Sequence, residues 1–306
     1  MLHSSIRAAS FRRLLIAVLL IVPLAGLGVK PNAQFPEAPQ AQVNPEEKFN
    51  LRFSPPPGQT LVYNLQTRMD SEGEGFLGKS LTLSAQADGE ISVFVRQVAR
   101  DSVFADLSSP GIRIFLQSPG RQNEFTLKNS PDSPVRVTFD RTGRIRDVKN
   151  VETLEKQNPL NFSILEVLRN YWPSFPERSL SLGESWPDHK RFVVPFQGMN
   201  LTIELEINFT LNSVVPSPNG RLAFITAAYT ATLSGDRQVE DYRGSFEGSG
   251  TGTGSLNFQI DSGTFSEYRL DYVINGAMVM RKAESEVAQW PFQLTANAGL
   301  LLLEWR

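Results

Sequence analysis

Apolar and polar residues alternate along several long stretches of this 306-residue chain. In the clearest stretch, 201–211, every odd position is apolar and every even position is Thr, Glu or Asn. Similar alternation runs through 61–69, 91–95 and 222–233. A period of two places successive side chains on opposite faces, so each stretch predicts a strand with one buried and one wet face. Strands of about 11 residues exceed the usual five or six, which favours a large curved antiparallel sheet.

One segment, 158–172, has helical periodicity instead. Asn158 is a suitable N-cap and Pro159 suits the first helical position. The apolar stripe of this predicted helix consists of Leu160, Ile164, Val167, Leu168, Tyr171 and Trp172. The helix is expected to be a crossover between two β-rich stretches; alternatively, it packs on the concave face of the curved sheet.

Two sequence landmarks occur twice. A Gly-led segment at 58–63 precedes an Asp-to-Gly turn at 140–143, and a second at 183–186 precedes a similar turn at 261–263. The distances from Gly to Asp are 82 and 78 residues. This near-equal spacing predicts two copies of one β-rich unit.

These patterns predict a mainly β fold: long antiparallel strands in a curved sheet or half-open barrel, built from two pseudo-repeats with one intervening helix. Because the linking segment is apolar on one face, it should pack on both units, which favours one sheet system over two domains. The predicted organisation is a leader (1–33), a Pro/Ala/Gln-rich tether (34–57), a first β unit (58–149), a linking helical segment (150–178) and a second β unit (179–306).

The N-terminus has the pattern of a signal peptide. Three arginines and no acidic residue precede the unbroken apolar run 14–22. Cleavage after Ala33 is preferred, with processing after Gly28 or retention as an uncleaved anchor left open. No later stretch reaches the ~18 apolar residues of a spanning helix, so no transmembrane segment is expected after the leader. We therefore expect an exported protein, periplasmic or extracellular.

Composition narrows the possible partners. The chain has no cysteine. It therefore cannot form disulfides, bind metals through thiolates, use a cysteine nucleophile or carry the lipid that anchors a lipoprotein through cysteine. Of its 30 basic residues four lie in the leader, leaving 26 against 32 acidic residues, a net charge of −6. This charge argues against nucleic acid or an anionic membrane surface as partner.

Glycine recurs at even positions through 244–254, in phase with the apolar residues 256, 258 and 260. The run lacks the Gly-Lys-Ser/Thr of a phosphate-binding loop. Since bare glycine on the core face of a strand permits bending or close approach, the run predicts a bend or a mobile hairpin. The alternative is a hollow beneath Gly250 and Gly252 that admits an apolar ligand.

The segment 260–264, Ile-Asp-Ser-Gly-Thr, resembles the signature of pepsin-like and retroviral-type aspartic proteases, in which two carboxylates share a proton. Asp261 would pair with Asp140. There, however, Arg141 follows the carboxylate and Gly143 arrives one position late. Ordinary β-turn chemistry is the preferred interpretation of both sites.

Other catalytic or metal-binding patterns are scarce. His189, the one histidine after the leader, is predicted to lie in a solvated loop beside Pro187, and no Gly-x-Ser-x-Gly elbow accompanies it. Asp70, Glu72 and Glu74 lack the EF-hand pattern and predict a solvated turn. No catalytic residue, metal site or cofactor is therefore expected.

Through 183–186 (Gly-Glu-Ser-Trp) and 140–143 (Asp-x-x-Gly), the chain resembles uncharacterised exported bacterial β-rich proteins of the cell envelope. That resemblance implies an envelope protein and supplies no activity. In shape the expected architecture is also similar to the periplasmic lipoprotein carriers, whose half-open barrel closes over acyl chains with a helix.

Three functions follow as hypotheses. The first is a non-enzymatic envelope protein that binds a lipid or other apolar ligand in the sheet concavity. The second is a structural or assembly protein whose sheet edges receive an envelope partner, and the third is a hydrolase that uses Asp261. For the first, the expected ligand-binding residues are Ile203, Leu205, Ile207, Phe209, Gly250, Gly252 and Leu168.

Overall fold

The computed structural model describes residues 47–306 apart from 75–79, 119, 160–162, 197–198, 240–241 and 283–284. The predicted leader, 1–33, and most of the predicted tether lie outside the described residues. Within the described part of the chain, no helix is long and apolar enough to cross a membrane.

Antiparallel strands dominate the described residues, with two short helices between the sixth and seventh strands. The strands are β1 (Thr60–Glu74), β2 (Ser80–Val98), β3 (Ser102–Ser118), β4 (Arg121–Asn129), β5 (Val135–Asp140), β6 (Ile145–Lys149), β7 (Ser185–Phe196), β8 (Met199–Ser217), β9 (Gly220–Val239), β10 (Tyr242–Gln259), β11 (Thr264–Lys282) and β12 (Ser285–Trp305). The helices are α2 (Glu152–Gln157) and α3 (Ile164–Tyr171).

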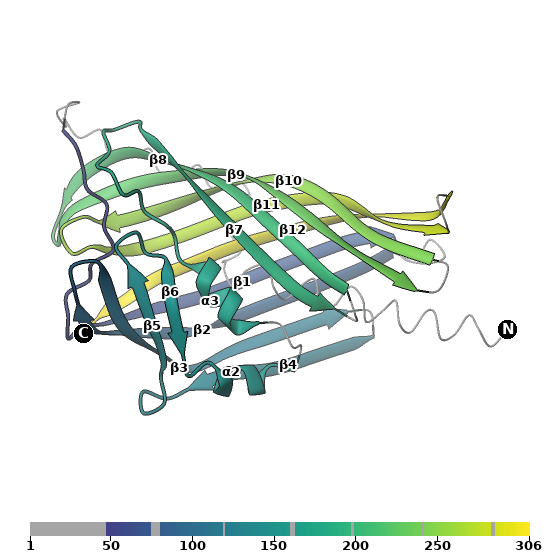
Figure 1. Ribbon diagram of the computed structural model, residues 1–306, viewed down its shortest axis with the longest axis horizontal. Coiled ribbons are helices and arrows are strands. Elements are labelled where there is room, and N and C mark those ends of the chain that lie inside the picture. The colour runs from purple at the N-terminus through teal and green to yellow at the C-terminus, as the bar shows by residue number, and fades with distance from the viewer. Residues whose placement is uncertain are drawn as a thin grey trace.

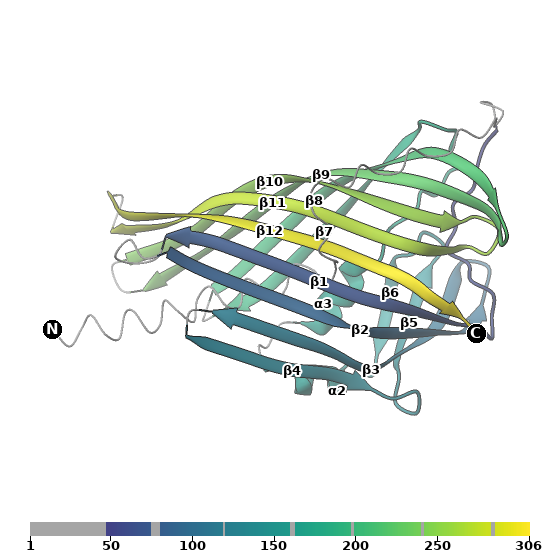
Figure 2. The same cartoon turned by 180° about the vertical axis from the view of Figure 1, so that it is seen from behind.

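All twelve strands belong to one sheet in the order β6-β5-β3-β2-β1-β12-β11-β10-β9-β8-β7, with β4 paired to β3 beside this path. The C-terminal strand β12 pairs with β1 and so joins the two predicted units in the middle of the sheet. The sheet curves around α3, which contacts both β6 and β7 (Figures 1 and 2). The predicted curved antiparallel sheet and single sheet system are confirmed.

The alternating stretch 201–211 forms the middle of β8. Its apolar odd positions are at most 2% exposed, whereas Glu204, Glu206 and Asn208 lie outside the core. In β10 the even positions face the same interior, so Gly248 to Gly254 share a face with Leu256 and Phe258. We call this face of the sheet, which carries the buried side chains, the concave face.

The repeated landmarks share local geometry. The amide of Gly58 donates to the carbonyl of Val95, and the amide of Gly183 donates to the carbonyl of Leu211 in the same way. The turns at Gly143 and Gly263 both need a positive φ, +81° and +64°. The first turn, however, follows the fifth strand of its unit and the second follows the fourth, so the units differ in strand number. The pseudo-repeat therefore stays a prediction.

The predicted single helix is replaced by two. Asn158 ends α2 instead of capping a longer helix, and the N-cap of α3 is Ser163, whose hydroxyl accepts the amide of Glu166 at 3.2 Å. The carboxylate of Glu155 also accepts the amides of Ile164 (2.8 Å) and of the residue after it. These caps satisfy the free amides of the first turn, which is why α3 begins there.

One end of the sheet is closed by aromatic packing. The ring of Trp172 lies between 5.3 and 6.5 Å from the rings of four residues, Phe53, Tyr63, Phe139 and Phe265. The neighbouring backbone is tied to both Asp-Gly turns, since the amide of Phe53 donates to Arg141 and that of Ser54 donates to Gly263. We call this region the aromatic end.

Candidate functional site

The predicted catalytic candidate Asp261 is bound to a single arginine. Its carboxylate accepts the backbone amide of Arg221 at 2.7 Å and the guanidinium Nη2 at 2.6 Å. These hydrogen bonds hold the pKa of Asp261 below its usual value. An ionised carboxylate with its own cation does not share a proton with a second carboxylate. Asp261 thus joins the β8–β9 turn to the β10–β11 turn.

Asp140 serves its own turn. Its Oδ1 accepts the amide of Thr142 at 2.9 Å, the hydroxyl of the same residue at 2.6 Å and the amide of Arg144 at 3.1 Å. Its Oδ2 accepts Arg146 Nε at 2.6 Å. Both aspartates therefore hold turn geometry and have separate arginine partners, an arrangement that differs from an aspartic-protease dyad.

Two predicted loop sites lie in strands. His189 belongs to β7, with its side chain half-exposed and 3.6 Å from Glu206. The prediction of a loop there was wrong because β7 is an edge strand, where Pro187 is tolerated. Asp70 and Glu72 lie in β1 instead of a turn. No group of three or more potential metal ligands occurs among the described residues.

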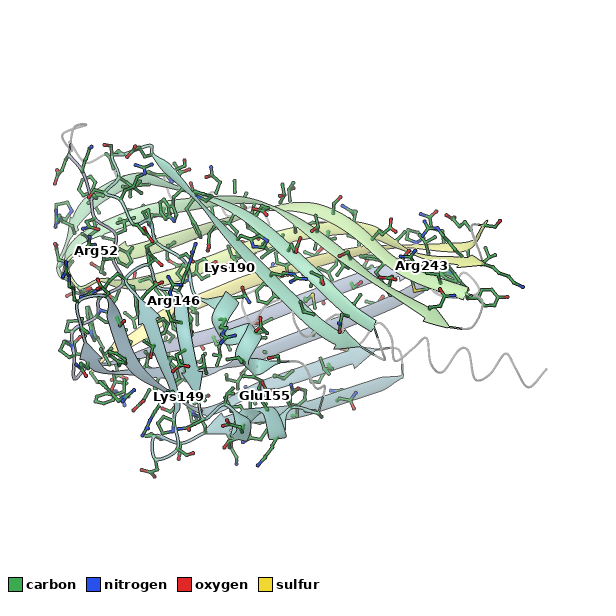
Figure 3. The ribbon with its side chains drawn as sticks, viewed as in Figure 1. Arg52, Arg146, Lys149, Glu155, Lys190 and Arg243 are labelled. Atoms are coloured by element: carbon green, nitrogen blue, oxygen red, sulfur yellow. The ribbon has the colours of Figure 1, made fainter. Side chains whose placement is uncertain are left out.

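A buried ion pair lies on the concave face of β7. Lys190 Nζ is 2.9 Å from Asp188 Oδ2 and donates to the carbonyl of Trp172 at 2.7 Å and the hydroxyl of Ser174 at 3.3 Å. Burial lowers the pKa of Lys190, and Asp188 opposes that shift. Figure 3 shows Lys190 on β7 beside α3. The pair thus attaches the segment after α3 to this edge of the sheet.

Side-chain amides cover parts of two sheet edges. Asn170 of α3 accepts the backbone amide of Arg191 in β7 at 3.3 Å. Gln157 of α2 both accepts from and donates to the backbone of Lys128 in β4, at 2.8 and 2.9 Å. Such contacts occupy hydrogen-bonding groups that an added strand would need. They do not favour the hypothesis of assembly through these edges.

The predicted ligand-binding residues share the concave face. Ile203, Leu205, Ile207 and Phe209 are all buried there on β8. The register aligns Ile207 with Tyr229 and Gly252, and Leu205 with Ala231 and Gly250. Leu168 of α3 packs against the same core.

Two tyrosines flank Gly252 in this face. The register places Tyr229 of β9 and Tyr272 of β11 directly opposite it, and their rings are 6.0 Å apart in an edge-on arrangement. A Cβ on Gly252 would lie 2.3 Å from Tyr229 Cζ. The glycine is therefore needed for the close approach of this ring, which fills the space where a hollow was expected. Phe292 similarly approaches Gly248, at 3.3 Å.

Tyr229 and Tyr272 belong to a larger group, the tyrosine cluster, which we define as Tyr171, Tyr229, Tyr268 and Tyr272. Burial raises the pKa of all four phenols, so they stay neutral donors at ordinary pH. Tyr268 lies close enough to Tyr171 and Tyr229 to raise the pKa of each further.

Three members of the tyrosine cluster have hydroxyls without a hydrogen-bond partner among the described residues, namely Tyr171, Tyr229 and Tyr272. Buried Trp172 Nε1 and Thr67 Oγ1 are also unpartnered there. Buried polar groups in folded proteins are nearly always hydrogen-bonded, so the three tyrosine hydroxyls need a physical account. One account is that these atoms bind groups of a ligand.

No protein-family model matches the chain, and comparison with curated proteins finds no match. Among solved structures, the chain is similar to an outer membrane channel from Pseudomonas putida F1, with 13% sequence identity and a TM-score of 0.15. The match covers 84% of this chain and 100% of the channel. At so low a TM-score the similarity carries no argument about fold or function.

Sequence reasoning missed the tyrosine cluster and the buried ion pair. Tyr229 and Tyr272 are in phase with the aliphatic and small residues that face the core. The alternation of the sequence could therefore have placed both tyrosines on the buried face. Asp188 and Lys190 are likewise in phase with the buried apolar residues Trp186 and Phe192. The expectation of a loop at 186–190 concealed that phase.

Proposed function

We propose that this chain is an exported, non-enzymatic envelope protein that binds an apolar or amphipathic ligand against the concave face of its sheet. One observation carries the proposal: a face of buried apolar rows also holds buried hydroxyls without partners. Apolar walls with a few polar groups are typical of sites for small organic ligands. The polar groups orient the ligand, and the walls supply most of the burial.

The concave face is long enough for a lipid-sized molecule. Phe258 lies twelve positions after Phe246 along β10, and both are buried. At ~3.3 Å per residue this length is about 40 Å. The hydrocarbon depth of one membrane leaflet is about 15 Å, half of a ~30 Å bilayer core. The face is therefore longer than an extended acyl chain.

Export is part of the proposal and is supported by the leader pattern of residues 1–33. The outward positions of β8 agree with an aqueous periplasmic or extracellular surface, because Thr202, Glu204, Glu206, Asn208 and Thr210 are all polar. N-terminal sequencing of protein recovered outside the cytoplasm tests this part. A mature N-terminus near residue 34 supports export with cleavage.

The binding function is tested by native mass spectrometry. Protein comprising residues 34–306 is purified from its own compartment without detergent and measured before and after denaturation. Extra mass that disappears on denaturation supports the proposal and identifies the ligand class. Protein without extra mass that also fails to take up acyl-chain probes contradicts it.

A further inference from the structure

The tyrosine cluster lies at a defined place on the concave face. In the cross-strand row that contains Gly252, the neighbours in the order β7 to β12 are Asp188, Ile207, Tyr229, Gly252, Tyr272 and Ala296. On the β10 strand, Gly252 lies six residues from both Phe246 and Phe258. The cluster therefore occupies the middle of the concave face, with apolar rows toward both ends.

The orientation of the cluster is set by steric fit. Because a Cβ at Gly252 would overlap the ring of Tyr229, that ring can extend across β10 only where the strand has glycine. Tyr272 approaches from the other side, with its ring centroid 6.0 Å away. The two hydroxyls are thus on rigid rings of the two strands that flank β10, and both are buried without a partner among the described residues. Rigid, unsatisfied donors suit a specific polar group.

The charges of this face are already neutralised. Within the described part of the chain, Asp188 and Lys190 are the buried charged residues, and they pair at 2.9 Å. The ammonium also donates to the Trp172 carbonyl and the Ser174 hydroxyl. The second oxygen of Asp188 accepts its neighbour's amide at 3.0 Å and lies 3.7 Å from Arg144. A phosphate, a carboxylate or an ammonium group would find no buried counterion that lacks a partner, and burying a charge without one is costly.

We infer that the tyrosine cluster binds the polar group of an uncharged amphipathic lipid, whose hydroxyl, ester or ketone oxygens accept hydrogen bonds from Tyr229 and Tyr272. This inference rests on the proposed function, which requires only that some apolar ligand is bound. The apolar body of the lipid lies along the neighbouring rows of the concave face, including Leu205 and Ile207. The class comprises diacylglycerols, neutral polycyclic alcohols and quinones, and excludes fatty acids and phospholipids.

Two probes that differ by one phosphate test the inference. Dioleoylglycerol and dioleoyl phosphatidic acid are each delivered from cyclodextrin to the mature protein, and binding is measured by native mass spectrometry. We expect at least tenfold tighter binding of dioleoylglycerol. Tyr229→Phe and Tyr272→Phe should each weaken that binding by about five- to tenfold, the usual effect of one lost hydrogen bond. Tyr242→Phe is the matched control and should leave it unchanged, because the Tyr242 ring lies under Lys282 away from the cluster.

Thermal unfolding of the ligand-free variants separates binding from folding. Removing an unpartnered buried hydroxyl should leave the melting temperature of Tyr229→Phe and Tyr272→Phe unchanged or raise it, while their affinity for dioleoylglycerol falls. Equal binding of the two probes, or unchanged affinity in both variants, would overturn the inference and leave the proposed function in place. Failure of the wild-type protein to bind either probe would overturn both.

Discussion

Buried tyrosines in two regions of the concave face differ in whether their hydroxyls are hydrogen-bonded. At the aromatic end, the Tyr63 hydroxyl donates to the carbonyl of Phe265 at 3.1 Å, and its ring stacks on the Phe265 ring at 4.8 Å. In the middle of the same sheet, the hydroxyls of Tyr229 and Tyr272 have no partner among the described residues. Burial raises the pKa of all three phenols, so their difference lies in hydrogen bonding. The aromatic end has the properties of a folding core, and the middle is where we propose that the ligand binds.

The same contrast applies to buried charge. Lys190 is close to the tyrosine cluster in the sheet, yet its ammonium is paired with Asp188 and donates to the Trp172 carbonyl and the Ser174 hydroxyl. Its interactions join β7 to the segment between α3 and the aromatic end. The paired charges therefore hold β7 in place beside hydroxyls that have no partner among the described residues.

The largest effect is expected from breaking the ion pair. Lys190→Met leaves Asp188 without its buried cation, and only the exposed Arg144 remains 3.7 Å away. The free energy of unfolding should therefore fall by about 3 kcal/mol. Chemical denaturation of the wild type and the variant measures this loss. The double variant Asp188→Leu/Lys190→Met removes both charges and should recover most of the stability. No recovery in the double variant would show that the pair does not act as a unit.

The next effect concerns the glycine beneath Tyr229. Gly252→Ala places a Cβ against the tyrosine ring and 2.4 Å from the Asp271 carbonyl, which should cost about 1–3 kcal/mol of stability. Gly244→Ala is the matched control on the same strand, since its Cβ would meet no atom within 4 Å. The two unfolding free energies are compared by urea denaturation. Equal values would contradict the steric role of Gly252.

A smaller effect is expected from comparing the hydrogen-bonded Tyr63 with the unpartnered Tyr272. Tyr63→Phe removes a satisfied hydroxyl and should lower stability by about 0.5–1.5 kcal/mol. Tyr272→Phe removes an unpartnered hydroxyl and should be neutral or slightly stabilising. Both variants are measured by urea denaturation of the ligand-free protein. The same loss in both would mean that Tyr272 is a structural tyrosine like Tyr63.

The smallest effect concerns Asp261. The pKa of Asp261 is lowered in the folded protein, mainly by the side-chain hydrogen bond from Arg221. The ionised carboxylate therefore stabilises the fold at pH values above its unfolded-state pKa, near ~4. This stabilisation is lost as the pH falls through the folded-state pKa. The carboxylate is half-exposed, which limits the effect to about 1 kcal/mol. Asp261→Asn should therefore melt below the wild type at pH 7 and together with it at pH 2. A difference that persists at pH 2 would assign the effect to another cause.

The strands and their faces could be predicted from local pattern. The odd residues of 201–211 are buried as alternation requires, and the glycines of β10 share the core face as their phase with Leu256 requires. The start of α3 could not be predicted in this way. Asn158 and Ser163 are both good N-caps, and the contact of Glu155 with the amide of Ile164 favours Ser163.

The tyrosine cluster depends on information that local pattern lacks. Tyr229 and Tyr272 are more than 40 residues apart in sequence. They meet only because the registers of β9 and β11 align both of them with Gly252. Whether a buried hydroxyl has a partner depends on that register and on α3 as well. The turn role of Asp140 was easier to predict, because an Asp-to-Gly turn satisfies this carboxylate locally, through Thr142 and Arg144. The partner of Asp261, Arg221, lies 40 residues away and could not be found from the turn motif.

Photoaffinity labelling tests the central claim, that a ligand binds on the concave face, most directly. A dioleoylglycerol analogue with a diazirine on an acyl chain is cross-linked to the mature protein, and the labelled residues are mapped by tandem mass spectrometry. The account predicts labelling of period two along β8, at Ile203, Leu205, Ile207 and Phe209 and not at the even positions between them. Labelling of the even positions, or labelling without periodicity, would contradict it.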